Sequence, residues 1–348
     1  MTYHFATLFD QNYLSRGLCL IQSLDVVLSN NYSLYILALD DNVVDYFARN
    51  QHQNVTILTL TELEEFYPEL VAAKTNRSKV EYYFTLSPIV PLYILENYKD
   101  CNRITTLDAD IYFYSTPEEI FKTYDINAIL ITPHDFSNHL EHLVHYGKYN
   151  VSFQSFPNTT NGLSVLKDWK EKCISWCGDY HDQTTGYFAD QKYLDDWEEN
   201  FKDIQPIELK TCGRAPWNIY ESELSFSNNK FLVGNKPLIY YHFHNLRINN
   251  NCVTLGLQDY EINSCSNIIK RVYSKYILTL YKFNKKRNLL DDKSVIRVNI
   301  NPKNSGIFRF ILQNEMGAII FSSKKIIFFN MRIKTNLIRL RNYLKWQN

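Results

Sequence analysis

The chain has 348 residues, with 37 Lys and Arg against 37 Asp and Glu and a formal net charge of zero. This length suits one large domain or one domain with an appendage, and the 45 % hydrophobic content supplies a core. No apolar run approaches the roughly 18 residues of a membrane-spanning helix, and the first residues lack the basic and apolar regions of a signal peptide. We therefore expect neither a spanning helix nor a signal peptide.

The zero net charge conceals an uneven distribution along the chain. From Lys270 to the end there are 18 Lys and Arg against 3 Asp and Glu, so this region carries +15 and the remainder carries −15. An acidic body with a basic tail predicts two functional parts. We expect the tail to contact an anionic membrane surface and not nucleic acid. The odd count of seven cysteines favours reduced thiols in the cytoplasm.

Strands and helices alternate from the start of the chain. The apolar patterns predict a strand at 5–9, a helix at 14–28, strands at 33–39 and 55–60, and a helix that begins at 61. This order is typical of an α/β fold with a Rossmann-like, mixed but mainly parallel sheet flanked by helices. No Gly-x-Gly-x-x-Gly follows the first strand, which argues against a dinucleotide cofactor.

The middle of the chain continues the alternation. We expect one long apolar helix at 79–98, with Pro88 and Pro91 inside it or at a kink, and a helix at 161–177. A further helix should begin at Asp190. Strands are expected at 103–107, 127–132, 149–156, 204–209 and 238–245.

The composition changes near residue 265, which predicts a catalytic domain at 1–265 and a basic, aromatic region at 266–348. A helix is expected at 268–286, and residues 296–329 alternate weakly. Residues 331–346 are strongly amphipathic, with a basic face and Trp346 near one end. This segment has two open interpretations, an interfacial membrane helix or a helix packed on the body.

Two carboxylates stand directly after the predicted strand at 103–107. Asp108 and Asp110 are spaced i, i+2, and in extended backbone such residues project to the same side. Together they could hold one hard cation, which takes oxygen ligands and commonly bridges phosphates. The alternative is a solvated loop with two acidic residues.

Polar residues also follow several other predicted strands. At the carboxyl edge of an open α/β sheet, where ligands bind, such residues can meet. His242 and His244 share one face if the strand at 238–245 is extended, so one could bind metal and the other a substrate phosphate. The polar residues at strand ends are Asp10, Asn12, Asp108, Asp110, His134, Asp135, His242 and His244.

Six short motifs follow one another in order over residues 3–250. They are Asp10-Gln11-Asn12-Tyr13, Leu107-Asp108-Ala109-Asp110, Tyr149-Asn150-Val151, Asp190-Gln191, Ala215-Pro216-Trp217-Asn218 and His242-Phe243-His244-Asn245. Their order and spacing resemble those of GT-A-fold glycosyltransferases, in particular the family 8-like bacterial enzymes of lipopolysaccharide and capsule assembly. In that family the end of the first strand begins the nucleotide-binding site, and the carboxylate pair matches the Asp-x-Asp motif.

The resemblance implies a role for each matching residue. Asp108, Asp110 and His242 would hold Mn²⁺ or Mg²⁺ on the diphosphate of a nucleotide-sugar, with His244 as the alternative metal ligand or a substrate-binding residue. Asp190 and Gln191 would line the donor sugar at its anomeric carbon. The nucleotide would contact Asp10, Asn12, Arg247 and the backbone of Thr7 and Leu8. Asp135 and Asn150 would meet sugar hydroxyls, and Trp217 would form a platform for a sugar ring.

The chain departs from the family pattern at several positions. Ser152 and Asn245 stand where the family commonly has Gly. Tyr83-Phe84-Thr85-Leu86 replaces a helix that usually carries an Arg, and Ile248 stands in place of a Lys, although Arg247 is adjacent. These departures affect the expected donor contacts more than the expected metal ligands.

The expected function is therefore that of a metal-dependent, hexosyltransferase-like enzyme. The resemblance implies transfer with retention to a glycan or lipid-linked glycan, in the cytoplasm or peripherally on the inner face of the cell membrane. Two rivals remain open. One is a catalytically inactive carbohydrate-binding protein. The other is an aspartate-dependent phosphohydrolase, whose carboxylate pair would be expected after the first strand.

Overall fold

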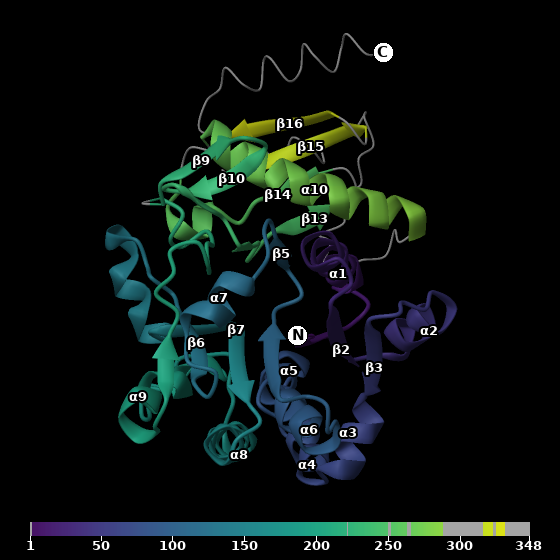
Figure 1. Cartoon of the computed structure of the whole chain (residues 1–348), viewed down its shortest axis with the longest axis vertical. Helices are drawn as coiled ribbons and strands as arrows, with labels where there is room; N and C mark the ends of the chain where they lie inside the picture. The colour runs from purple at the N-terminus through teal and green to yellow at the C-terminus, as the bar shows by residue number, and fades with distance from the viewer. Residues whose placement is uncertain are drawn as a thin grey trace. The chain divides into compact units, whose positions relative to one another are not determined.

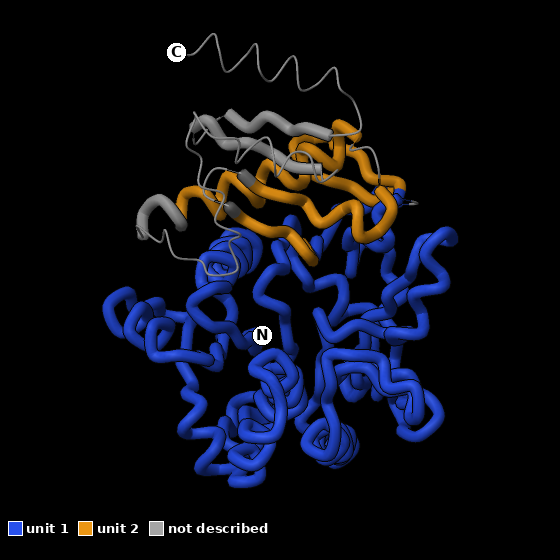
Figure 2. The backbone as a smooth tube through the Cα atoms, turned by 180° about the vertical axis from the view of Figure 1, so that it is seen from behind, with its two compact units in different colours: residues 1–222, 235–242 blue, residues 223–234, 243–348 orange. Residues whose placement is uncertain are grey.

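The structure is a computed structural model that describes residues 2–220, 222–249, 252–262, 266–287, 316–322 and 325–330. The chain divides into two compact units (Figure 2). Unit 1 comprises Met1–Ser222 and Asn235–His242, and unit 2 comprises Glu223–Gly234 and Phe243–Asn348. The functional division at residue 265 stays a prediction. The expected helix at 331–346 lies outside the described residues.

A seven-stranded sheet forms the centre of unit 1 (Figure 1). Its strands are β1 (Tyr3–Phe9), β2 (Tyr32–Ala38), β3 (Val55–Thr59), β4 (Arg103–Leu107), β6 (Ile129–Pro133), β7 (Tyr149–Pro157) and β8 (Ile204–Pro206). They stand in the order β3-β2-β1-β4-β7-β6-β8. Only β7 runs antiparallel to its neighbours β4 and β6, and every other pair is parallel. The predicted mixed, mainly parallel α/β sheet is confirmed.

Helices flank this sheet and cover its apolar strands (Figure 1). They are α1 (Leu14–Leu28), α2 (Asp41–Arg49), α3 (Leu60–Phe66), α4 (Glu69–Thr75), α5 (Lys79–Thr85), α6 (Ile89–Asn97), α7 (Glu118–Thr123), α8 (Thr160–Ser175) and α9 (Trp197–Asn200), with 3₁₀ helices η1 (Asn138–Tyr146) and η2 (Gln191–Asp196). Consecutive residues of β2 are buried on both faces, which explains why its sequence is continuously apolar and not alternating.

The predicted single helix at 79–98 is wrong, because α5 ends at Thr85 and a new helix, α6, begins at Ile89. Pro88 is the N-cap of α6. A proline disfavours helical backbone in the residue before it, so a helix ends ahead of it. Pro91 lies in the first turn of α6, where its missing N–H leaves no intrahelical bond unmade.

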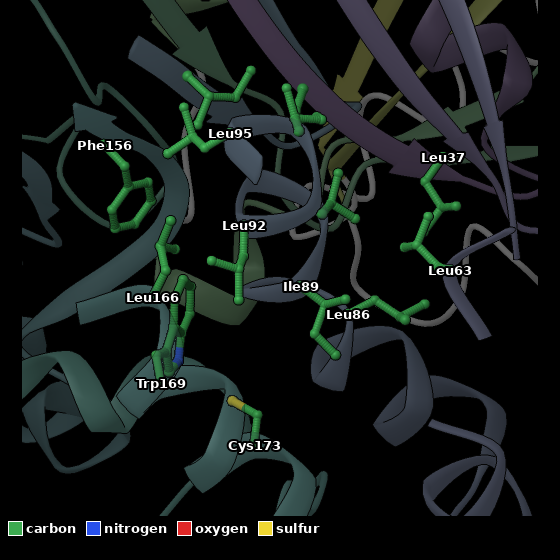
Figure 3. Packing of buried hydrophobic residues seen from close by; sticks show 14 of the residues in the cluster. Leu37, Leu63, Leu86, Ile89, Leu92, Leu95, Phe156, Leu166, Trp169 and Cys173 are labelled. Atoms are coloured by element: carbon green, nitrogen blue, oxygen red, sulfur yellow. The ribbon is translucent and has the colours of Figure 1, made fainter. Parts of the chain in front are cut away.

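A hydrophobic core joins these helices to the sheet (Figure 3). Leu37 of β2, Leu92 of α6, and Leu166 and Trp169 of α8 are all fully buried. The indole Nε1 of Trp169 donates a hydrogen bond to the main-chain oxygen of Asp190 at 2.9 Å. The core therefore fixes the backbone at one of the predicted site residues.

The sheet has a topological switch point between β1 and β4. Successive strands β1, β2 and β3 extend in one direction from it, and β4 begins the other half. The ladder between β1 and β4 pairs only Phe5 with Thr105 and Ala6 with Thr106. In open α/β sheets ligands bind outside the carboxyl ends of the strands at such a point.

Three short strands complete unit 1, namely β5 (Ile111–Phe113), β11 (Lys236–Pro237) and β12 (Tyr240–His242). β5 and β12 form an antiparallel ladder, with Tyr240 opposite Phe113 and His242 opposite Ile111. This ladder joins the last residues of unit 1 to the segment that follows β4.

Unit 2 contains an antiparallel hairpin, a four-stranded antiparallel sheet and a long helix. The hairpin β9 (Leu224–Ser227) and β10 (Lys230–Val233) turns at Asn228 and Asn229, whose φ angles of 48° and 60° suit the tight hairpin turn that asparagine tolerates. The sheet has the order β13-β14-β15-β16, and a short 3₁₀ helix, η3 (Gln258–Tyr260), follows β14. Its strands are β13 (Arg247–Asn249), β14 (Cys252–Thr254), β15 (Met316–Ser322) and β16 (Lys325–Asn330).

The predicted helix at 268–286 is confirmed by α10 (Asn267–Arg287). Across the residues that the structure describes, no helix has both the length and the hydropathy needed to cross a membrane.

Candidate metal and nucleotide site

Asp108 and Asp110 lie in a tight turn between β4 and β5. The N–H of Ile111 donates to the carbonyl oxygen of Asp108 at 3.2 Å, and the N–H of Asp108 donates to the carbonyl oxygen of Ser152 on β7 at 3.0 Å. The expectation that extended backbone presents the two carboxylates is therefore wrong. A turn carries them instead, and in it one carboxylate oxygen of each lies near the other.

His242 reaches this turn from a different part of the chain. The β5–β12 ladder places it opposite Ile111. Its Nε2 lies 3.0 Å from Oδ1 of Asp110 and 3.5 Å from Oδ2 of Asp108. One ligand atom from each of the three residues falls within 4.8 Å of the others. Asp110 and His242 are buried, whereas the Asp108 side chain is 39 % exposed. We call these three residues the acidic triad.

The charges of the acidic triad perturb one another. Partial burial of the Asp108 carboxylate raises its pKa, although 39 % of the side chain stays exposed, with His242 acting to lower the pKa and Asp110 to raise it. Burial acts to lower the pKa of His242, but the two carboxylates outweigh it and the pKa is raised overall. Two carboxylates and one imidazole form a donor set that suits Mn²⁺, and Mg²⁺ through the oxygens. A divalent cation fits this group chemically, since it would supply positive charge between two neighbouring carboxylates and accept the imidazole as a further ligand.

Arg214 and Trp217 hold His242 in place. The N–H of His242 donates to the carbonyl oxygen of Arg214 at 2.8 Å. The Trp217 ring meets the imidazole edge to face, with centroids 5.3 Å apart, and meets His134 in the same way at 5.1 Å. Sequence reasoning missed Arg214, although it directly precedes the Ala215–Asn218 motif. Trp217 is only 4 % exposed and its ring contacts are to side chains of the protein, so its position favours a role in holding His242. Stacking of a sugar on Trp217 stays a prediction.

The strand that carries His242 ends there, and His244 lies in the turn that follows. The expectation that both histidines share one face of an extended strand is therefore wrong. Within unit 2, Nδ1 of His244 lies 2.6 Å from the hydroxyl of Tyr260. Arg247 is exposed and pairs with Thr254 in the β13–β14 ladder. The substrate roles of His244 and Arg247 stay predictions.

The predicted nucleotide-binding residues lie at the end of β1, beside the switch point. Asp10 directly follows this strand and is buried, and its carboxylate accepts from the backbone and the side-chain amide of Asn12 at 3.0 Å each. Thr7 and Leu8 pair with β2 in the strand itself. The structure adds Lys79 of α5, whose Nζ lies 2.9 Å from Oδ2 of Asp10. Hydrogen bonds to Tyr83 and Asp10 raise the pKa of Lys79.

Asp190 is a buried acid at the start of η2. Burial raises its pKa to about 7, a side-chain hydrogen bond with Ser87 acts to lower it, and the charge of Asp108 acts to raise it. Its Oδ2 has no hydrogen-bond partner among the described residues. Ser87 lies in the break between α5 and α6, so the break that the sequence did not predict supplies a contact to a predicted site residue. Gln191 donates from Nε2 to the carbonyl oxygen of Tyr146 at 3.1 Å.

Asp135 and Asn150 make contacts within the protein. Asp135, at a φ of 50°, accepts from Nζ of Lys210 at 2.8 Å and from Nη2 of Arg214 at 2.9 Å. Burial acts to raise the pKa of Asp135, but these two cations together lower it. The Asn150 amide donates to the carbonyl oxygens of Thr132 and Pro133 at 3.2 Å each. Their contact with sugar hydroxyls stays a prediction.

No protein-family model matches the chain. Two curated relatives from Bacillus subtilis strain 168 are similar to it. The uncharacterized protein YfnD is 26 % identical over 290 residues, which cover 81 % of this chain and 90 % of YfnD. The uncharacterized protein YfnF is 27 % identical over 258 residues, which cover 71 % of this chain and 83 % of YfnF.

Solved structures of glycosyltransferases are also similar to the chain. Mouse xyloside xylosyltransferase 1 has a TM-score of 0.43 and 13 % identity, and the match covers 70 % of this chain and 98 % of that one. The galactosyltransferase LgtC has a TM-score of 0.45 and 11 % identity, with 69 % and 87 % covered. The glycosyltransferase GlyE of Streptococcus pneumoniae TIGR4 has a TM-score of 0.46 and 12 % identity, with 82 % and 64 % covered.

Proposed function

We propose that the chain is a metal-dependent glycosyltransferase of the family 8 type that uses a nucleotide-diphosphate sugar as its donor. The observation that carries this proposal is the acidic triad. Two residues of a turn after β4 and a third from β12, far along the chain, place one ligand atom each within 4.8 Å. The two aspartates follow β4, which borders the switch point of the sheet, where a nucleotide is expected to bind.

Each part of the site has a proposed task. Asp108, Asp110 and His242 hold Mn²⁺ or Mg²⁺ at the diphosphate. The cation would offset negative charge that develops on the leaving diphosphate. Asp10 and Asn12, with the backbone of Thr7 and Leu8, receive the base and ribose. The arrangement at the end of β1 supports this, because Lys79 and Asn12 already hold the Asp10 carboxylate in one position.

Asp190 and Gln191 are proposed to line the anomeric carbon of the donor sugar, and the transfer retains the anomeric configuration. In that step the bond from the anomeric carbon to the phosphate oxygen breaks, and a bond to the acceptor oxygen forms. The acceptor hydroxyl proton leaves with the diphosphate. The buried carboxyl of Asp190 suits such a position, since its Oδ2 has no hydrogen-bond partner among the described residues.

The proposed acceptor is a glycan or a lipid-linked glycan. We assign catalysis to residues 1–265 and association with the inner face of the cell membrane to the basic region at 266–348. The charge of +15 from Lys270 to the end supports this assignment, because anionic lipids attract clustered Lys and Arg.

The proposal is tested by nucleotide release from a panel of nucleotide-sugars, with Mn²⁺ or with a chelator. Slow release of nucleoside diphosphate that requires Mn²⁺ is the expected result, because such enzymes hydrolyse their donor in the absence of acceptor. Inorganic phosphate as the product would instead identify a phosphohydrolase, and no release from any donor would identify a binding protein. The position of the carboxylate pair after β4 and not β1 speaks against the phosphohydrolase. The complete set of Asp108, Asp110 and His242 speaks against an inactive binding protein.

The Asp110→Asn variant sharpens this test. Asn keeps the shape of the side chain but removes the charge that faces His242 at 3.0 Å. We expect Mn²⁺-dependent nucleotide release to fall by at least about 100-fold, with an unchanged circular dichroism spectrum. Asp45→Asn, at a 65 % exposed carboxylate of α2, is the matched control and should keep full activity. Unchanged release by Asp110→Asn would refute the metal site.

A further inference from the structure

We propose that a cluster of aromatic side chains beside Gln191 is the binding surface for a pyranose ring of the acceptor. This inference rests on the proposed function. The cluster, which we call the aromatic surface, consists of His145 and Tyr146 at the end of η1 and His181 and Phe188 from the segment between α8 and η2. Ring centroids lie 3.9 Å apart for His145 and Tyr146, 4.8 Å for Tyr146 and Phe188, and 5.5 Å for His145 and His181.

The aromatic surface is open to solvent. Tyr146 is 37 % exposed, His145 is also exposed, and His181 and Phe188 are half-buried. Tyr180, the neighbour of His181, is 57 % exposed. Rings that served only to fill a core would be buried, whereas these rings contact one another and still face water. A single exposed ring needs no explanation, but rings that are in contact with one another and still reach solvent form a continuous surface on which a ligand could pack.

Two hydrogen bonds connect the aromatic surface to the residues proposed to act at the donor sugar. Nε2 of Gln191 donates to the main-chain oxygen of Tyr146 at 3.1 Å. The N–H of Ala189 donates to the carbonyl oxygen of Gly178 at 3.0 Å, which ties the segment before His181 to the residue next to Asp190. Both halves of the aromatic surface are therefore anchored to residues 189–191.

The chemistry of the aromatic surface fits a sugar ring. The carbon-bound hydrogens on one face of a pyranose pack against the electron-rich face of an aromatic ring, while its hydroxyls need polar neighbours. Two of the four rings are imidazoles. Nδ1 of His145 lies 2.5 Å from the main-chain oxygen of His142, and Nδ1 of His181 lies 3.3 Å from Nε2 of Gln183, so Nε2 is the nitrogen that each ring would offer to a sugar hydroxyl. A stable protein interface buries about 800 Å² on each side, far more than four rings present. We therefore favour a glycan over a protein partner.

Binding of the fluorescently labelled full chain to a printed glycan array tests this inference. Wild type should bind a subset of glycans. The signal of Tyr146→Ala on these glycans should be at least about 10-fold lower than that of wild type, because the ring that stacks on the sugar is absent. This variant keeps the main-chain oxygen that Gln191 uses. Tyr146→Phe keeps the ring and should retain most of the binding.

Phe66→Ala is the matched control, because Phe66 on α3 is 47 % exposed and meets Tyr67 and Tyr93 edge to face. It should bind like wild type. Glycan binding is measured without donor and metal. The result therefore does not depend on whether the protein turns over nucleotide-sugars, and failure of this inference can be told apart from failure of the proposed function. Absence of glycan binding by wild type, or equal binding by Tyr146→Ala, overturns the inference.

Discussion

Replacing Asp190 by Asn should improve the stability of the protein relative to wild type as the pH rises from 5 to 8, while it removes a proposed active-site residue. Asp190 is 2 % exposed, and burial raises its pKa to about 7, with the Ser87 bond lowering it and Asp108 raising it. An unfolded Asp ionises near pH 3.9. Between these two values the folded state holds a proton that the unfolded state has released. The free energy of unfolding therefore falls as the pH rises from about 4 to about 7, and this group adds no further change above that.

The size of the effect follows from the shift. From pH 5 to pH 7 the loss is about 1.36 kcal/mol for each pH unit, or about 3 kcal/mol in total. Asn does not titrate in this range, so its stability relative to wild type should improve by about 3 kcal/mol between pH 5 and pH 8. Its buried amide could cost about 1–3 kcal/mol, but that cost is the same at both pH values. The main-chain oxygen that Trp169 uses is unaffected.

Urea unfolding followed by tryptophan fluorescence, in EDTA at pH 5 and pH 8, measures this difference. Asp45→Asn, at an exposed carboxylate, serves as the control and should show the pH dependence of wild type. If the difference in free energy of unfolding between Asp190→Asn and wild type is the same at pH 5 and pH 8, the reasoning is refuted, because ionising the buried Asp190 would then cost no stability.

Three further predictions concern other parts of the chain. Arg77→Lys should lower the free energy of unfolding in urea by about 2–4 kcal/mol. The Arg77 guanidinium donates three hydrogen bonds of 2.6–2.8 Å, to Thr85 and to two carbonyl oxygens at the end of α8, and the ammonium of Lys cannot replace all three. A loss under about 0.5 kcal/mol would contradict this. Trp217→Ala should weaken Mn²⁺ binding about 10–100-fold in calorimetry, because the His242 ring loses the ring that packs against it. Trp217→Phe should weaken Mn²⁺ binding less. Equal Mn²⁺ affinities of wild type and Trp217→Ala would exclude a positioning role for Trp217. Deletion of residues 331–348 should lower pelleting with anionic liposomes, and unchanged pelleting would assign that segment to packing.

Much of the fold was predictable because the local pattern of apolar and polar residues indicates its strands and helices. The run Arg103–Leu107 predicted β4, and the polar residues after β1 and β4 predicted a site at one sheet edge. Periodicity failed at 79–98, where apolar residues continue through a break that only Pro88 signals. It also failed at Asp108 and Asp110, since spacing alone does not separate a turn from an extended strand.

The contacts that complete the site were not predictable, because they join residues that are distant in the sequence. Lys79 pairs with Asp10 over a separation of 69 residues, and Arg214 pairs with Asp135 over 79. An exposed lysine on a helix and an arginine in a loop are common, and their local sequence contains no sign of the distant carboxylate. The polar residues at strand ends predicted that His242 or His244 binds metal, and only the resemblance of motifs favoured His242. The β5–β12 ladder provides the physical reason for its position.

The β5–β12 ladder also has a consequence for protein synthesis. The ribosome produces Asp108 and Asp110 more than a hundred residues before His242, since the two paired strands stand at 111–113 and 240–242. During that interval the nascent chain can form β1 to β4 with both carboxylates in place, yet it lacks the imidazole ligand. Domains commonly begin to fold during translation. A growing chain of this protein should therefore acquire its sheet well before it can hold a metal ion through all three residues.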